Sequence, residues 1–345
     1  MLNALTRLVT RLIVSLPGSV LIRMSGRPQM TASGGRVFDP AGQFVAVTAL
    51  KQGIFGLDDT KTVPELRVIW QKQMKPFEKP PLRSVRRQDR TVEVEGGSIT
   101  VAEFSPKAVQ PGGPAVLFFH GGGYSSMGIW ACRSLCEYFA RELNAKVYAV
   151  GYRLAPEHPY PTQLNDANAA LEWVRANAAD LEIDPERISV AGDSAGGNLT
   201  AVLCLKRRDD EKWLPKAQMM VYPFIDYTFS HPSIEELGEG HIITTTHLEW
   251  LKSNFLHGRP LEKDPYVSPL FAPDLSGLPP AVVITAGFDL VRDEGKAYAD
   301  RLSEAGVNTQ YKEFMTEGHG FMYADTTKSI KAANAEIAAM FKTLI

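Results

Sequence analysis

The chain has 345 residues, of which 44% are hydrophobic and 22% are charged, and its formal net charge is −2 at pH 7. This composition is typical of a globular protein and excludes a disordered one, and the balanced charge offers no basic surface for nucleic acid. Three cysteines in a chain of this length argue against a disulfide framework, and no further cysteine or histidine stands at the spacing of a zinc site.

Residues 1–85 predict a helical N-terminal segment that prolines break into short pieces. Its first helix is amphipathic, with Arg7 and Arg11 on one side and these residues at helical spacing on another: Leu2, Leu5, Val9, Leu12, Ile13 and Leu16. We favour a helix laid over the main domain, and a helix on a membrane surface is the alternative. The apolar stretch 12–22 is too short to span a bilayer, and no cleavage site follows it. We therefore expect no stable membrane insertion, no secretory signal and a cytoplasmic protein.

From residue 90 onward the sequence alternates between strand and helix patterns. Residues 91–94 and 99–104 flank a Gly-Gly pair and predict a hairpin, and residues 115–119 form the fully apolar run of a strand buried on both faces. The later elements are predicted at 132–143 (helix), 146–152 (strand), 164–176 (helix), 187–191 (strand), 195–206 (helix), 217–222 (strand), 246–255 (helix), 281–285 (strand), 295–305 (helix), 310–314 (strand) and 327–342 (helix). This rhythm predicts an α/β fold with a mostly parallel sheet. Residues 86–345 would form this domain, with an insertion at about 224–270.

A glycine-rich loop follows the strand at 115–119 and reads His120-Gly121-Gly122-Gly123-Tyr124. Acyl transfer places negative charge on the former carbonyl oxygen, and backbone amides that point at this oxygen stabilise it. We predict that the amides of Gly122, Gly123 and Ala195 form such an oxyanion hole, while His120 shapes the loop. A phosphate-binding loop is the alternative, but the Gly-Lys-Ser/Thr ending that it needs is absent.

The predicted nucleophile is Ser194, in Gly192-Asp193-Ser194-Ala195-Gly196. A bare G-x-S-x-G match is weak, but here an apolar strand leads into the motif and a helix leads out of it, as in a nucleophile elbow. The glycines let strand and helix approach closely, and the helix N-terminus favours developing negative charge. A glycine-rich turn with a capping serine is the non-catalytic alternative.

The predicted base is His319, which stands between the last strand and the last helix and so reaches the same edge of the sheet as Ser194. The acid that orients it should follow the preceding strand, where Asp289 stands. Asp293 is the competitor, and we interpret it as a cap of the following helix. The chain order Ser, Asp, His is the order of the α/β-hydrolase fold.

These motifs resemble those of the hormone-sensitive-lipase-like branch of α/β-hydrolases, the bacterial family IV carboxylesterases. The resemblance rests on His120-Gly121-Gly122-Gly123, Tyr152-Arg153-Leu154-Ala155-Pro156-Glu157, Gly192-Asp193-Ser194-Ala195-Gly196-Gly197, Asp289 with Arg292-Asp293-Glu294-Gly295, and His319-Gly320-Phe321. It covers roughly residues 85–345, and more loosely residues 20–75. It implies an eight-stranded, mostly parallel sheet with a helical cap that combines the N-terminal segment and the insertion. It also implies hydrolysis of short- to medium-chain acyl esters without metal or organic cofactor, and a possible homodimer.

The sequence thus predicts a serine carboxylesterase that acts on small-molecule esters through an acyl-enzyme. Tyr124 and Met127 are predicted to contact the substrate, with Trp130 as a further lining or core residue, and Arg153 and Glu157 are predicted to form a supporting ion pair. Three alternatives remain open: an amidase or deacetylase with the same triad, a non-catalytic receptor on this fold, and a true lipase, for which the N-terminal amphipathic helix is the only sequence indication.

Overall fold

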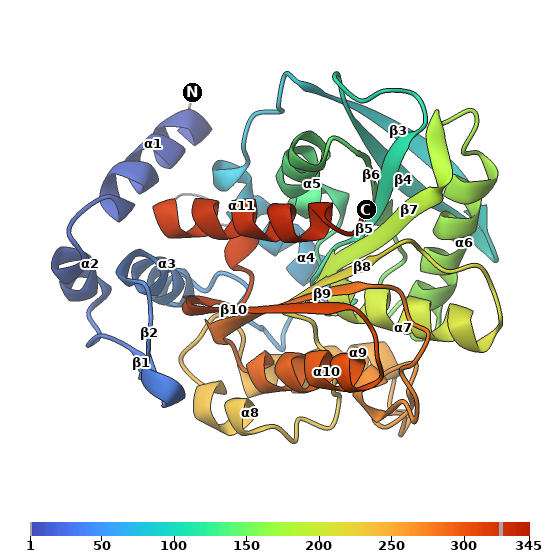
Figure 1. The fold of residues 1–345 in the computed structure, drawn as a ribbon. Coiled ribbons are helices and arrows are strands. Elements are labelled where there is room, and N and C mark those ends of the chain that lie inside the picture. The colour runs from blue at the N-terminus through green and yellow to red at the C-terminus, as the bar shows by residue number, and fades with distance from the viewer. Residues whose placement is uncertain (1, 324–326) are drawn as a thin grey trace.

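A single eight-stranded sheet forms the centre of the molecule (Figure 1). The computed structural model describes residues 2–323 and 327–345, with side chains from residue 6 onward. The strand order is β10-β9-β8-β7-β5-β6-β4-β3, and all neighbours pair in parallel except those that involve β4. The strands are β3 (Val85–Val94), β4 (Gly97–Pro106), β5 (Gly113–Phe119), β6 (Lys146–Gly151), β7 (Ile183–Asp193), β8 (Gln218–Val221), β9 (Ala281–Phe288) and β10 (Thr309–Gly318). The predicted mostly parallel sheet of eight strands is confirmed.

Helices cover both faces of this sheet (Figure 1). One face carries α5 (Ile129–Leu143) and α11 (Lys328–Lys342), and the other carries α6 (Thr162–Ala176), α7 (Ala195–Asp209) and α10 (Arg292–Glu304). Every residue of β9 between them is buried. A strand covered on both sides loses its polar alternation and becomes a continuous apolar run, which is why the central strands could be recognised from the sequence.

The N-terminal segment contains four helices and a two-stranded ladder before the sheet begins. They are α1 (Leu2–Val14), α2 (Gly18–Ser25), β1 (Thr31–Ala32), β2 (Arg36–Val37), α3 (Pro40–Lys51) and α4 (Val63–Met74). Helix α4 begins with a capping box, because the Thr62 hydroxyl accepts the Glu65 amide while the Glu65 carboxylate accepts the Thr62 amide. Helix α1 contacts the 3-10 turn η2 (Lys75–Phe77), but Leu8 and Leu12 on it are 55% and 61% exposed. Of the residues on the predicted apolar side, Val9 and Leu12 are 44% and 61% exposed, so the favoured arrangement, with the main domain covering that side, is wrong for these two.

The insertion between β8 and β9 carries α8 (Pro232–Leu237) and α9 (Thr245–Leu256), and the second of these matches the predicted helix at 246–255. The Thr244 side chain caps α9 by accepting the amide of His247. Among the described residues no single helix is long and apolar enough to cross a membrane. The segments Thr6–Val14 and Gly18–Ser25 meet that requirement only when taken together across a 115° bend.

Candidate active site

Ser194 lies on a sharp turn between β7 and α7, with φ +54° and ψ −121°. The turn is fixed by the Ser194 amide, which donates to the Val221 carbonyl over 2.9 Å. A Cβ atom on Gly196 would lie 1.9 Å from the Phe119 carbonyl oxygen, and one on Gly192 would lie 2.2 Å from the Gly196 carbonyl oxygen. Both glycines are therefore required by close approach of the backbone, and the elbow holds the serine side chain out at the sheet edge.

Three side chains from the carboxyl ends of β7, β9 and β10 meet at this edge. Ser194 Oγ lies 2.9 Å from His319 Nε2, and His319 Nδ1 lies 2.7 Å from Asp289 Oδ2. The second carboxylate oxygen of Asp289 accepts the Val291 amide over 3.0 Å. Because the Asp289 carboxylate accepts a hydrogen bond from Nδ1–H, the lone pair on Nε2 faces the serine hydroxyl, as a general base requires.

The charge state of His319 is set by opposing effects. Burial lowers its pKa, but the charge of Asp289 and the hydrogen bond to it, together with the charge of Asp193, raise the pKa above the usual value of 6.5. The imidazolium that forms when the serine loses its proton is thus stabilised. This arrangement can transfer a proton from a hydroxyl and return it to a leaving group.

The glycine loop after β5 runs beside the serine. In the described part of the chain no hydrogen bond uses the amides of Gly122, Gly123 or Ala195, so these three donors are free. A Cβ atom on Gly122 would lie 2.4 Å from the Ser126 carbonyl oxygen, and one on Gly123 would lie 2.3 Å from Leu251 of α9. Close backbone therefore requires glycine at Gly122, whereas at Gly123 the neighbour is a movable side chain and the φ of +59° favours glycine.

Two buried groups hold the start of this loop. Asp193 Oδ1 accepts the Gly121 amide over 2.9 Å and the Tyr323 hydroxyl over 2.8 Å. Burial raises the pKa of Asp193 to about 6, although these hydrogen bonds oppose the rise. His120 lies under the ring of Tyr152, whose hydroxyl donates to the His120 carbonyl over 2.6 Å. Burial lowers the pKa of His120 to about 4, so its ring is neutral and shapes the loop as expected.

Arg67 of α4 is a contact residue that the sequence did not reveal. Its Nε donates to the Ser125 carbonyl over 2.6 Å, and the guanidinium also donates to the Ala155 carbonyl and pairs with both carboxylate oxygens of Glu157. The predicted ion pair between Arg153 and Glu157 is therefore wrong. Arg153 pairs instead with the buried carboxylate of Asp166 over 2.6 Å. No local sequence motif predicts the contacts of Arg67, because its partners lie 58 to 90 residues further along the chain.

The predicted pocket residues differ in their surroundings. Tyr124 is 1% exposed, stacks on Phe255 at 4.2 Å and donates its hydroxyl to Asn198 over 2.7 Å, so it packs behind the loop. Met127 and Trp130 are half-buried. The substrate contacts of Tyr124 and Met127 stay predictions.

The interpretation of Asp293 as a helix cap is wrong. Helix α10 begins one residue earlier, at Arg292, and has no side-chain cap. The Asp293 carboxylate accepts the Ser233 amide over 2.9 Å and the Nε hydrogen of Arg292 over 2.7 Å. It thus joins the insertion to α10, and of the two carboxylates it is Asp289 that hydrogen-bonds the imidazole of His319.

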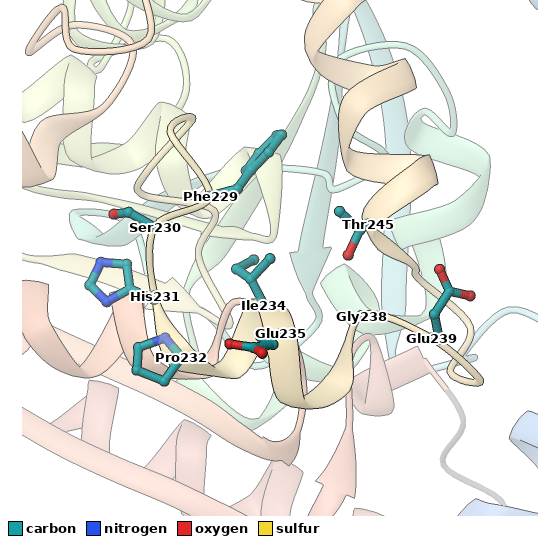
Figure 2. Close-up of a pocket in the computed structure, with 9 residues that line it drawn as sticks. All are labelled: Phe229, Ser230, His231, Pro232, Ile234, Glu235, Gly238, Glu239 and Thr245. Atoms are coloured by element: carbon teal, nitrogen blue, oxygen red, sulfur yellow. The ribbon is translucent and has the colours of Figure 1, made fainter.

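Two hollows border residues of the insertion between β8 and β9. A cavity of about 20 Å³ borders His319 and Asp289, and its other walls are Phe38, Ala46, His241, Ile242, Ile243, Phe288, Leu290 and Gly318. Figure 2 shows a larger, open hollow of about 490 Å³ around Phe229, Glu235 and Thr245 of the insertion, to which no triad residue contributes. Of these two hollows, the small cavity is the one that borders His319 and Asp289, and most of its wall is apolar.

Comparison with known proteins also indicates the α/β-hydrolase fold, and the similar proteins include ester hydrolases. The family described as having the α/β-hydrolase fold matches residues 116–323. The carboxylic ester hydrolase LipN of Mycobacterium tuberculosis is 33% identical over 84% of this chain and 78% of that protein. An ethyl acetate hydrolase of Pseudomonas putida is 35% identical over 66% of this chain and 73% of that protein. The solved structure of EstE1, a thermostable carboxylesterase cloned from a metagenomic library, is 35% identical, has a TM-score of 0.79, and covers 84% of this chain and 100% of its own.

Proposed function

The chain belongs to the hormone-sensitive-lipase-like carboxylesterases of the α/β-hydrolase superfamily and is a carboxylic-ester hydrolase, and from this premise we propose that Ser194, His319 and Asp289 are its catalytic triad. The observation that carries the proposal is the 2.9 Å distance from Ser194 Oγ to His319 Nε2, continued by the 2.7 Å distance from Nδ1 to Asp289. A serine hydroxyl is a weak nucleophile until an adjacent base takes its proton, and this contact provides the base.

The proposed reaction has two halves. Ser194 Oγ attacks the ester carbonyl carbon while His319 Nε2 takes the hydroxyl proton, and the resulting oxyanion accepts hydrogen bonds from the amides of Gly122, Gly123 and Ala195. The imidazolium of His319 then protonates the leaving alcohol as the C–O bond breaks, which leaves an acyl group on the serine. Water attacks this acyl-enzyme by the same route and releases the acid.

We propose that the substrates are small esters with short to medium acyl chains. The relative named as an ethyl acetate hydrolase supports this. We also propose that residues 1–85 and about 224–270 form a cap on the catalytic domain of residues 86–345, supported by Phe38 and Ile242, which line the same cavity. A cytoplasmic location agrees with three buried free cysteines, and both this location and a homodimer stay predictions.

A nucleophile test decides the proposal. Ser194→Ala should lower kcat on a p-nitrophenyl ester by about 10⁵-fold or more, because the attacking oxygen is gone while the fold remains. An organophosphate should add its mass to the wild-type protein at Ser194 and to no residue of the variant. Ser303→Ala, which removes a hydroxyl bonded within α10, is the matched control and should keep wild-type rates. Turnover by Ser194→Ala within about tenfold of the wild type would refute the assignment.

A further inference from the structure

Helices α1 and α2 present an apolar surface that the described part of the molecule leaves open. Exposed fractions reach 55% for Leu8, 61% for Leu12 and 46% for Met24. We call this region the hairpin surface, and it consists of Leu8, Val9, Leu12, Leu16, Val20 and Met24, each at least 40% exposed. In Figure 1 both helices lie outside the layers that cover the sheet. Leu8 and Leu12 are four residues apart in α1, as are Val20 and Met24 in α2, so each pair lies along one side of its helix. Exposed apolar side chains grouped in this way are typical of an interaction site.

Helix α1 does not bury its whole apolar side, as a helix that covers a domain would. Such a helix normally buries its apolar side and turns its charges to solvent. Here Arg7 turns toward the body and donates to the Glu78 carbonyl, and Val14 packs with Leu21. Leu8 and Leu12, one helical turn apart, point away. The outward side of α1 therefore lacks the cover that its composition calls for.

The charge of this segment is equally one-sided. Residues 1–38 contain five arginines and no acidic residue, so they carry +5, and the rest of the chain carries −7. Arg11 and Arg23 are exposed and form no ion pair within the described residues. Apolar side chains flanked by unpaired arginines, on helices that lie along a surface, are the features that bind the interface of an anionic membrane.

We propose that the hairpin surface docks on the face of a bilayer that contains anionic phospholipids. Leu8, Leu12 and Met24 enter the interfacial region, and Arg11 and Arg23 lie near the lipid phosphates. A second copy of this chain fits the surface less well, because two hairpins face to face would bring like charges together. The proposal rests on α1 and α2 alone and is independent of the catalytic assignment.

Docking would place the catalytic edge near the lipid. Helix α2 packs on α3, and α3 supplies Ala46 to the wall of the cavity beside His319. The docked face and the triad are therefore separated by one layer of helices. Esters that partition into the interface would be close to the enzyme that cleaves them.

Co-sedimentation of the full chain with vesicles tests the proposal. We expect binding to phosphatidylcholine vesicles that contain phosphatidylglycerol, little binding to pure phosphatidylcholine, and release at high salt. Arg11→Gln and Arg23→Gln should each weaken partitioning about fivefold. Leu8→Ser with Leu12→Ser should weaken it by more than about tenfold. Each variant should keep wild-type kcat on a water-soluble ester, which shows that the fold is intact.

Matched variants remove the same chemistry elsewhere. Arg83→Gln with Arg86→Gln removes two exposed charges at the start of β3, and Phe271→Ser removes an exposed apolar side chain between α9 and β9. These variants should bind like the wild type. Binding that ignores phosphatidylglycerol, binding that survives high salt, or a dimer in analytical ultracentrifugation that Leu8→Ser with Leu12→Ser disperses would each overturn the proposal.

Discussion

Arg67, on helix α4, donates its Nε hydrogen to the carbonyl oxygen of Ser125 over 2.6 Å. The Ser125 amide in turn donates to the Gly122 carbonyl over 3.1 Å. Ser125 therefore links the arginine to Gly122, whose amide belongs to the proposed oxyanion hole. The same guanidinium holds Ala155 and Glu157 on the neighbouring segment. The N-terminal segment is thus bonded to the loop that carries two of the proposed oxyanion donors, Gly122 and Gly123.

We predict that Arg67→Ala lowers kcat on a short-chain ester about tenfold with a smaller change in KM, because the loop loses its anchor and the amides lose their alignment. Two backbone carbonyls also lose a charged donor, so the free energy of unfolding should fall by about 1–3 kcal/mol. Steady-state kinetics and urea unfolding measure both effects.

Two further variants serve as controls. Glu157→Gln should lower kcat and the free energy of unfolding by less than Arg67→Ala does, because the hydrogen bonds from Arg67 to Ser125 and Ala155 remain. Lys72→Ala, also on α4, should leave kcat unchanged. A fall in stability without a fall in kcat would show that Arg67 supports the cap and not the loop.

The three residues of the proposed triad could be predicted because each directly follows a strand of the sheet, two of them buried (β7 and β9) and one at the edge (β10). Ser194, Asp289 and His319 come one residue after β7, β9 and β10, and parallel strands end at a common edge. The contacts of Arg67 could not be predicted, because its partners are distant in sequence and include two backbone carbonyls. The Arg153–Glu157 pair failed because a spacing of four residues favours contact only in a helix, and residues 152–157 are not helical.

The pH dependence of activity should follow His319. Its pKa is raised above 6.5, and the base must be neutral, so kcat/KM should rise with pH to a plateau with a midpoint above that value. Asp289→Asn removes the negative charge that favours the imidazolium, so the midpoint should fall. The plateau should also fall by about 10³–10⁴-fold, because the imidazole loses its orienting partner. Asp180→Asn, an exposed carboxylate, is the control, and an unmoved midpoint in Asp289→Asn would contradict the assignment.

Asp193 predicts a pH-dependent cost to stability. Its folded pKa is about 6 against an ordinary 3.8, so the folded state binds the proton more tightly than the unfolded state. The free energy of unfolding should therefore fall as pH rises from about 4 to 6, by on the order of 3 kcal/mol from this group.

Asp193→Asn cannot ionise and keeps an oxygen that accepts from Gly121 and Tyr323. It should be more stable than the wild type at pH 8 and close to it at pH 4, by denaturant unfolding at both values. The midpoint of the acid limb of kcat/KM should also shift to lower pH, because the charge of Asp193 helps to raise the pKa of His319. Asp300→Asn, in an exposed pair with Lys296, should show neither change. Equal destabilisation at both pH values would contradict the buried-charge explanation.

Gly122 and Gly112 form a matched pair for the oxyanion loop. Both have positive φ, +108° and +73°, so alanine strains the backbone at either position by about 1 kcal/mol. Only at Gly122 would the new Cβ meet backbone, 2.4 Å from the Ser126 carbonyl oxygen, whereas Gly112 has open space. We expect Gly122→Ala to lower kcat about 100-fold through a displaced loop, and Gly112→Ala to lower only the melting temperature. Equal kcat values for the two variants would separate Gly122 from the chemistry.

Leu251 of α9 lies over the oxyanion loop, since its Cδ2 occupies space 2.3 Å from where a Cβ on Gly123 would be. A side chain there limits the room beside the scissile carbonyl. We predict that Leu251→Ala raises the ratio of kcat/KM for an octanoyl over a butyryl ester about 3- to 10-fold, because a few methylenes of pocket space are worth that much discrimination.

The control for this prediction lies one turn earlier on the same helix. Leu248 is buried in the core, so Leu248→Ala should destabilise the protein by about 2–5 kcal/mol while the octanoyl-to-butyryl ratio stays at the wild-type value. A changed ratio in both variants would mean that loosening α9, and not the space above Gly123, controls chain length. A changed ratio in Leu251→Ala alone would assign chain-length selection to the contact between the insertion and the oxyanion loop.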